Sequence, residues 1–117
     1  MGRRICFMAY VSITGLKLKS IIHAPEFWWH AISSMAQAKR AAGNLSTDAR
    51  TINGVHHTVT LWENREAMLA YLRSGAHLKA MKSFKRVGTG KVLGYEADQA
   101  PAWGEVHDLW QTKGRNV

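Results

Sequence analysis

The chain alternates between short β-rich runs and longer stretches with a helical period. Runs rich in β-branched and aromatic residues predict strands over residues 5–13, 45–52, 55–62 and 91–97. A helical period predicts a helix over 26–42, where Glu26, His30, Ser33, Gln37 and Arg40 form a polar stripe. A second helix is expected from Asn64 to about Ser74, followed by one or two further turns up to Gly88.

Local signals at the ends of these elements support the same boundaries. Pro25 is suited to the first turn of the first helix, because its missing N–H has no partner to lose there. Gly43 and Gly75 are suited to helix ends, and Asn64 to an N-cap. The Asn53-Gly54 pair predicts a tight hairpin between the second and third strands.

The order strand, helix, strand, strand, helix, strand predicts a ferredoxin-like α+β fold, β-α-β-β-α-β, with a four-stranded antiparallel sheet. Right-handed crossovers place both helices on one face of that sheet. We expect this domain to cover residues 1–100. Residues 101–117 are expected to be a C-terminal tail, in which Trp103, Val106, Leu109 and Trp110 fit a short docking helix.

The first strand is apolar on both sides, so both faces of the sheet require cover. We expect the side carrying His57 to lie under the helices. The side carrying Met8, Tyr10 and Trp62 would then face water in a monomer. Burying apolar surface yields about 25 cal/mol per Å², which favours pairing with a second copy in a two-fold homodimer.

Composition agrees with one globular domain. The 117 residues are 46% hydrophobic and 21% charged, and no apolar run approaches the roughly 20 residues of a membrane span. The basic start before an apolar run is similar to a signal peptide but lacks a small-residue cleavage site, so a first strand is favoured. The single cysteine, Cys6, excludes an internal disulfide, and cytoplasm is the expected compartment.

The net charge of +8 favours anionic partners such as nucleic acid, acidic lipid or a carboxylated ligand. Most basic residues are scattered, and a local concentration occurs only between residues 79 and 91. The simpler interpretation of that concentration is a solvated helix face. It contains Lys79, Lys82, Lys85, Arg86 and Lys91.

The segment from Thr60 to His77, TLWENREAMLAYLRSGAH, resembles the antibiotic-biosynthesis-monooxygenase superfamily. Residues 61–63 and 75–81 look most like the spheroidene-monooxygenase-related proteins. The resemblance implies a dimeric α+β barrel and an oxygenase-like activity. It leaves the cofactor open between none and haem, because the superfamily includes cofactor-free oxygenases and haem-degrading enzymes.

The resemblance also implies where the chemistry would lie. His77 matches the position where simpler relatives hold a pocket histidine. Alignment on Trp62 puts Met81 at the iron-ligand position of the haem degraders, and Tyr71 where they carry a second tryptophan. His77 is therefore the candidate catalytic residue, as an acid/base or a ligand. A structural histidine that donates to a nearby carbonyl is the competing interpretation.

The remaining histidines give weaker signals. His56 and His57 are adjacent on a strand, so they point to opposite faces and cannot chelate one metal together. His57 is a candidate cavity wall, while His23 and His30 fit a loop and a polar helix face. No spacing typical of a zinc or non-haem iron site is present, so no metal is predicted.

Aromatic residues could line an apolar ligand pocket between the sheet and the helices, or simply form the core. We expect Trp28, Trp62 and Tyr71 to form the walls, with Arg73 or Arg50 as an anchor for an anionic group. Trp28 and Trp29 lie about 100° apart on a helix, so one of them is expected to cover a cavity mouth or a partner surface.

Three functions follow from these residues. The first is a monooxygenase-like enzyme acting on an apolar, polycyclic or polyene molecule. The second is a non-catalytic dimer that binds a small ligand or a protein. The third is a nucleic-acid binder driven by the +8 charge, which the lack of an aromatic-plus-basic strand motif disfavours.

Overall fold

The computed structural model describes residues 9–116. The elements follow in this order: β1 (Ala9–Leu18), the 3-10 turn η1 (Ile21–His23), α1 (Ala24–Arg40), β2 (Asn44–Ile52), β3 (Val55–Trp62), α2 (Arg65–Leu72), α3 (Gly75–Val87), β4 (Gly88–Ala97), α4 (Trp103–Lys113) and β5 (Arg115–Asn116). The strands form one sheet in the order β2-β3-β1-β4-β5. Every adjacent pair is antiparallel.

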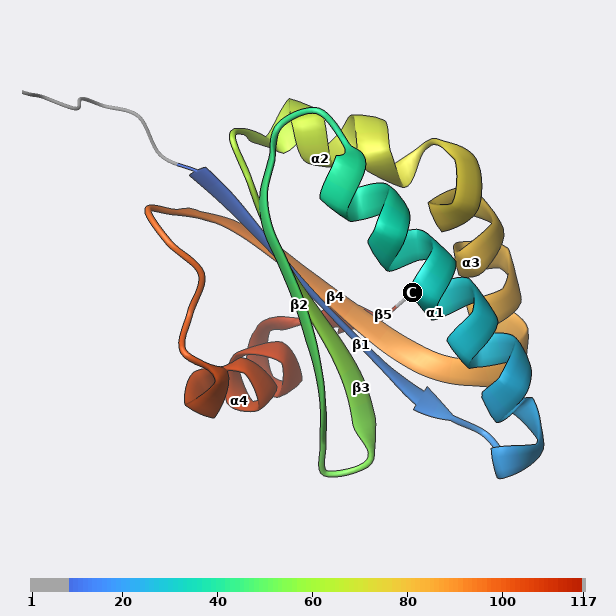
Figure 1. Cartoon of the computed structure of the whole chain (residues 1–117). Coiled ribbons are helices and arrows are strands. Elements are labelled where there is room, and N and C mark those ends of the chain that lie inside the picture. Colours follow the sequence, from blue (N-terminus) through green and yellow to red (C-terminus); the bar gives the residue numbers. More distant parts are fainter. Residues whose placement is uncertain (1–8, 117) are drawn as a thin grey trace, which may run out of the picture.

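The predicted α+β fold with an antiparallel sheet is confirmed, the helix expected in the tail is α4, and the structure adds the short strand β5. Helices α1, α2 and α3 lie on one face of the sheet, and α4 lies on the other (Figure 1). Strand β1 continues to Leu18, beyond the predicted end at residue 13. It can do so because it pairs along its length with β3 on one side and β4 on the other.

The helices cover the face that was expected to meet a second chain. Trp62 is fully buried beneath them, and Tyr10, its cross-strand partner, packs in the same cluster. The placement of Tyr10 and Trp62 in a dimer interface is therefore wrong. Met8, the third residue of that expectation, lies outside the described residues.

The opposite face carries His57, which was expected under the helices. Its core consists of aliphatic residues from β1 and β3 packed against Val106 and Trp110 of α4. The prediction assigned the helices to the wrong face of the sheet. Both faces carry apolar residues, so the alternation of side chains along a strand does not indicate which face the helices cover. The tail segment supplies the missing cover from within the same chain.

Three polar contacts fix α4 on the sheet. The Trp110 Nε1–H donates to the Lys91 carbonyl at 2.9 Å, and the Trp103 Nε1–H donates to Asp48 Oδ2 at 2.8 Å. His57 Nε2 lies 2.9 Å from His107 Nδ1. A Cβ on Gly15 would come within 2.5 Å of the Trp110 ring, so the absence of a side chain at residue 15 makes room for the indole.

Capping and turn signals place the helix layer where the sequence predicts it. Asn64 accepts a hydrogen bond from the Ala67 N–H at 2.9 Å and begins α2. Asn53 and Gly54 have φ values of 52° and 77°, which suits the tight turn between β2 and β3. The register from this hairpin puts Trp62 at the end of β3, directly before α2.

Candidate functional site

Three predicted site residues come together between the sheet and the helices. Trp62, at the end of β3, stacks on Tyr71 of α2 with 5.1 Å between ring centroids. His77, in the first turn of α3, also packs against the Tyr71 ring, with 4.5 Å between ring centroids. The break between α2 and α3 allows this, because it turns His77 back toward the ring of Tyr71. These residues are the aromatic row of the site.

The Tyr71 hydroxyl is held by α1. It donates to the Ser34 carbonyl at 3.0 Å and lies 2.7 Å from the Ser34 hydroxyl. Burial raises the pKa of Tyr71, and the hydrogen bond to Ser34 partly opposes that rise. Tyr71 is therefore a protonated, fixed phenol at neutral pH.

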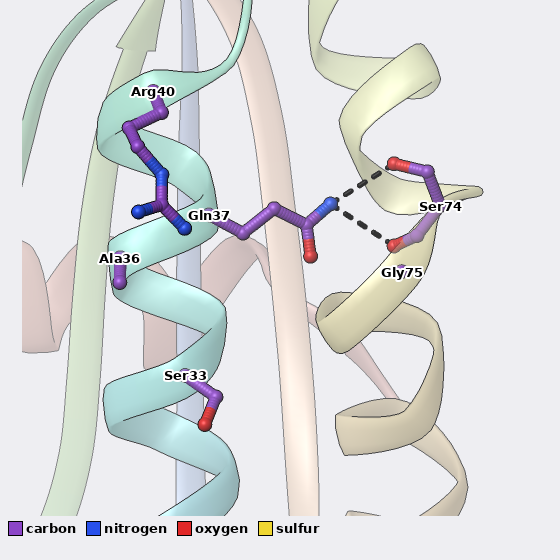
Figure 2. Close-up of a pocket in the computed structure, with 6 residues that line it drawn as sticks. All are labelled: Ser33, Ala36, Gln37, Arg40, Ser74 and Gly75. Atoms are coloured by element: carbon purple, nitrogen blue, oxygen red, sulfur yellow. Dashed lines mark hydrogen bonds between the residues drawn. The ribbon is translucent and has the colours of Figure 1, made fainter.

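Gln37 of α1 fastens the junction between α2 and α3. Its Nε2 donates to the Ser74 carbonyl at 3.0 Å and to the Ser74 hydroxyl at 2.9 Å, as Figure 2 shows. Its Oε1 accepts from the backbone N–H of His77 at 2.8 Å. One side chain thus sets the position from which His77 enters the aromatic row.

Two buried polar atoms of the row have no hydrogen-bond partner among the described residues: Trp62 Nε1 and His77 Nδ1. An unpaired buried polar group costs about 1–3 kcal/mol, so a fold under no other demand would satisfy or remove it. Burial lowers the pKa of His77, and a hydrogen bond to the backbone of Leu72 partly opposes that fall. His77 is accordingly neutral near pH 7 and has a free ring nitrogen.

Two adjoining pockets open between α1 and the α2–α3 junction. One, of about 340 Å³, reaches the aromatic row at Tyr71 and is otherwise lined mainly by alanines, with Gln37, Arg40 and Ser74. The other, of about 570 Å³, is lined by Ser33, Ala36, Gln37, Arg40, Ser74 and Gly75 (Figure 2). Together they form a groove with Gln37 at its centre and Arg40 at its rim.

The other predicted site residues lie elsewhere. Trp28 is 43% exposed and contacts Phe27 and His56, outside the aromatic row. His57 and Arg50 belong to the α4 face, where Arg50 lies 5.3 Å from the Trp103 ring centroid. Arg73 is exposed at the end of α2 and lines neither pocket.

Sequence reasoning missed three residues of the site: Ser34, Gln37 and Arg40. Gln37 and Arg40 were visible in the polar stripe of the first helix, which was assigned no contact. The stripe carries the groove and the contact to the α2–α3 junction. Ser34 gave no signal, since a lone serine in a helix has no distinctive pattern.

Haem, which the resemblance leaves open, does not fit this arrangement. The Tyr71 ring packs against the His77 ring, and His77 lines neither pocket. Met81, at the aligned ligand position, is exposed on α3. Within residues 9–116, no three His, Cys, Asp or Glu side chains gather as metal ligands. We therefore assign no role to haem.

Among the described helices, none is both long and apolar enough to cross a bilayer. No family model and no curated protein matches the sequence. Solved structures do match. A conserved protein from Methanosarcina mazei superposes with a TM-score of 0.70 at 9% identity, over 78% of this chain and 94% of that one.

Two further matches carry a name related to activity. SnoaB, a cofactor-independent oxygenase from Streptomyces nogalater, gives a TM-score of 0.64 at 14% identity, over 79% of this chain and 95% of that one. A "putative antibiotic biosynthesis monooxygenase" from Deinococcus radiodurans gives 0.68 at 21%, over 80% and 96%. The chain has the fold of the antibiotic biosynthesis monooxygenase-like proteins, and the predicted resemblance is confirmed at that level.

Proposed function

We propose that the protein is a monooxygenase-like enzyme that acts on an apolar, polycyclic or polyene molecule at the aromatic row. The observation that carries this proposal is the pair of unpaired buried atoms, Trp62 Nε1 and His77 Nδ1, whose rings both contact Tyr71. Both atoms can bind a ligand oxygen, and His77 can also accept a proton. The oxygenase names of proteins with this fold support the same class.

The ligand would enter through the groove between α1 and the α2–α3 junction. Tyr71 forms part of its wall, and Gln37 spans it by bonding to Ser74 and His77. Opening these bonds would admit a flat molecule beside Tyr71. Arg40 at the rim would hold an anionic substituent, a role the sequence suggested for Arg50 or Arg73.

The chemistry requires a ligand with an acidic C–H or O–H bond and dioxygen as co-substrate. Neutral His77 takes the proton, and the carbanion or phenolate formed reduces dioxygen. One oxygen atom forms a new C=O bond, and the other leaves as water with two hydrogens from the substrate. Trp62 Nε1–H would stabilise the negative oxygen that develops during deprotonation.

Homodimerisation and a cytoplasmic location belong to this proposal as predictions. Helix α4 does not fully cover β4, where Leu93 and Tyr95 are only partly buried. A second sheet would have to pack on this uncovered part of β4. Light scattering of the purified chain measures its mass against the 13.1 kDa of one copy.

A non-catalytic ligand-binding module is the competing function. The close packing of Trp62, Tyr71 and His77 favours it, since a ligand must displace side chains to reach His77. Such a module would bind the same apolar molecules without consuming oxygen. The two functions differ in turnover alone, so one experiment with two readouts separates them.

Anthrone is a suitable probe, because its oxidation to anthraquinone and water requires only a base and dioxygen. Binding is measured by quenching of tryptophan fluorescence, and turnover by an oxygen electrode and the quinone absorbance. His77→Gln should lower turnover by about 10²–10⁴-fold, the usual contribution of a general base. The matched control His30→Gln, on the polar side of α1, should retain activity. Binding without oxygen uptake supports the non-catalytic module. If the protein shows neither binding nor oxygen uptake, both functions are overturned.

A further inference from the structure

The exposed apolar side chains of the protein gather at one place. Five of the eight large hydrophobic residues exposed in the described structure lie between residues 21 and 32. They are Ile21 at 86% exposure, Ile22 at 76%, Trp28 at 43%, Trp29 at 72% and Ile32 at 65%. We name this set the α1 apolar face. A contiguous exposed patch of this kind is uncommon unless it meets a partner.

Of the α1 apolar face, Trp28 touches the core through Phe27, whereas Trp29 and Ile32 point away from it. Helix α1 buries Phe27, Ser34 and Ala38 against the sheet, and these residues repeat at a helical period on one side. Trp29 and Ile32 lie on the other side of the helix. Since polar residues at these positions would leave the core unchanged, folding does not explain a tryptophan and an isoleucine there.

Basic residues surround this face. Lys19 lies two residues before Ile21 and is exposed. Helices α1 and α3 together carry six Lys and Arg residues and a single acid. The basic residues are Lys39, Arg40, Lys79, Lys82, Lys85 and Arg86.

The single acid, Glu26, is ionised, and its charge is offset by its ion pair with Arg86. Ser83 and Arg86 donate to its carboxylate and hold its pKa at about 2. These bonds and those of Gln37 to Ser74 fix α1 and α3 as an antiparallel pair, visible side by side in Figure 1. In that alignment Lys79 and Lys82 lie opposite the part of α1 that carries Trp29.

We propose that the α1 apolar face, with its flanking lysines, docks onto the surface of an anionic lipid bilayer. Tryptophan suits the headgroup region, isoleucine suits the acyl boundary, and lysines attract acidic headgroups. This is the combination that Trp29, Ile32 and the lysines of α3 supply. The α4 side lies on the opposite side of the sheet and would point away from the bilayer (Figure 1).

Two other occupants fit less well. Nucleic acid requires basic and aromatic groups that contact phosphates and bases, and Ile21, Ile22 and Ile32 provide neither contact. A second copy would bring the lysines of α3 next to their equivalents, because a two-fold interface pairs a patch with itself. A bilayer has no such like-charge repulsion.

Vesicle sedimentation tests the proposal. The protein should bind vesicles of phosphatidylcholine mixed with phosphatidylglycerol, and bind pure phosphatidylcholine vesicles much less. Trp29→Ser with Ile32→Ser should weaken binding about 10–100-fold, since each removes one buried apolar anchor. Replacing Lys79, Lys82 and Lys85 by glutamine should weaken it by about 100-fold, at about 5-fold per lysine. Added salt should weaken the binding of the unmodified protein.

Controls make the outcome specific to this face. Leu45→Ser, an exposed apolar residue outside the face, and Lys113→Gln on α4 should bind vesicles as the unmodified protein does. Circular dichroism confirms that each variant folds. The proposal is overturned if none of the variants alters vesicle binding or if both vesicle types bind equally. It is also overturned if the protein forms a dimer, or binds single-stranded RNA, and the double variant Trp29→Ser with Ile32→Ser abolishes that association. No readout requires turnover, so the result is independent of the proposed enzyme function.

Discussion

The two faces of the sheet are packed on different principles. On the α4 face, the polar atoms of His57, Trp103 and Trp110 have partners, and the other buried residues of its core are aliphatic. On the helix face, Trp62 and His77 each keep a buried nitrogen without a partner, beside a phenol that is fully bonded. Both faces carry apolar residues, and they differ in whether their buried polar atoms have hydrogen-bond partners.

This difference distinguishes structure from function within one sheet. A face that only stabilises the fold can satisfy its polar atoms, as the α4 face does. Unpaired atoms persist where another demand overrides stability, and active sites are where such demands arise. The contrast between the two faces therefore supports a site at the aromatic row more strongly than any single residue of it.

The largest expected effect is the loss of the α4 anchor. Trp110→Ala should lower the free energy of unfolding by about 3–5 kcal/mol, because Trp110 is buried against the aliphatic core of that face. Urea unfolding followed by circular dichroism measures it. Trp29→Ala, which removes an exposed indole, should change stability by less than about 0.5 kcal/mol. Equal effects would show that α4 does not belong to the stabilising face.

The next effect compares one histidine from each face. His57→Leu should cost about 1–3 kcal/mol, because it leaves the Thr14 carbonyl and His107 Nδ1 without their partner. His77→Leu should be close to neutral, since it keeps the volume, and the removal of the unpaired Nδ1 offsets the loss of the hydrogen bond to the Leu72 backbone. Urea unfolding of both variants at pH 7.5 gives the comparison. A destabilised His77→Leu would mean that His77 is structural.

Acid should weaken the fold in two steps. Burial lowers the pKa of His56, His57 and His77 below the ordinary value of 6.5. The unfolded chain then binds more protons than the folded one, so stability is full above about pH 6.5 and falls as the pH drops below it. A second fall should follow between pH 4.5 and about 2, where Glu26 is protonated in the unfolded chain first.

Unfolding midpoints measured from pH 8 to pH 3 resolve these steps. His57→Leu should flatten the first fall, because one of the three histidines no longer takes up a proton on unfolding. Glu26→Gln should flatten the second and leave the first unchanged. A stability that rises on acidification through pH 6 would contradict the burial of the histidines.

The smallest effect concerns the edge of the α4 face. Trp103→Phe should cost about 0.5–1 kcal/mol, because it removes the hydrogen bond to Asp48 and retains most of the ring packing. That bond is the main cause of the lowered pKa of Asp48, so the pKa should rise toward its ordinary value. An NMR titration of the Asp48 carboxyl measures the change. An unaltered pKa would place the cause in the Ala49 N–H or in nearby cations.

The elements of the fold could be predicted from local pattern. The hairpin and its two strands were expected over 45–52 and 55–62, and the structure has Asn44–Ile52 and Val55–Trp62. What local pattern does not contain is the choice of face. Because the first strand was expected to be apolar on both sides, Trp62 and His57 were each assigned to the wrong face, and the position of α4 shows which face each one occupies.

The site could be predicted in part for the same reason. Trp62, Tyr71 and His77 lie within one continuous segment, so the resemblance captured them together. Gln37 and Ser34 come from α1, far away in sequence, and their contacts depend on how α1 packs on α2 and α3. The assignment of Arg50 to the same pocket failed because β2 presents it to α4.

The close approach of Gly15 and Trp110 offers a way to sort related sequences. A backbone position with no side chain admits the indole, and any larger residue at 15 would push it away. A homologue with valine or threonine at the equivalent strand position must therefore seat its terminal helix differently or lack one. Homologues that have both a glycine at the position of Gly15 and a tryptophan at the position of Trp110 would be expected to cover this face of the sheet with a helix like α4.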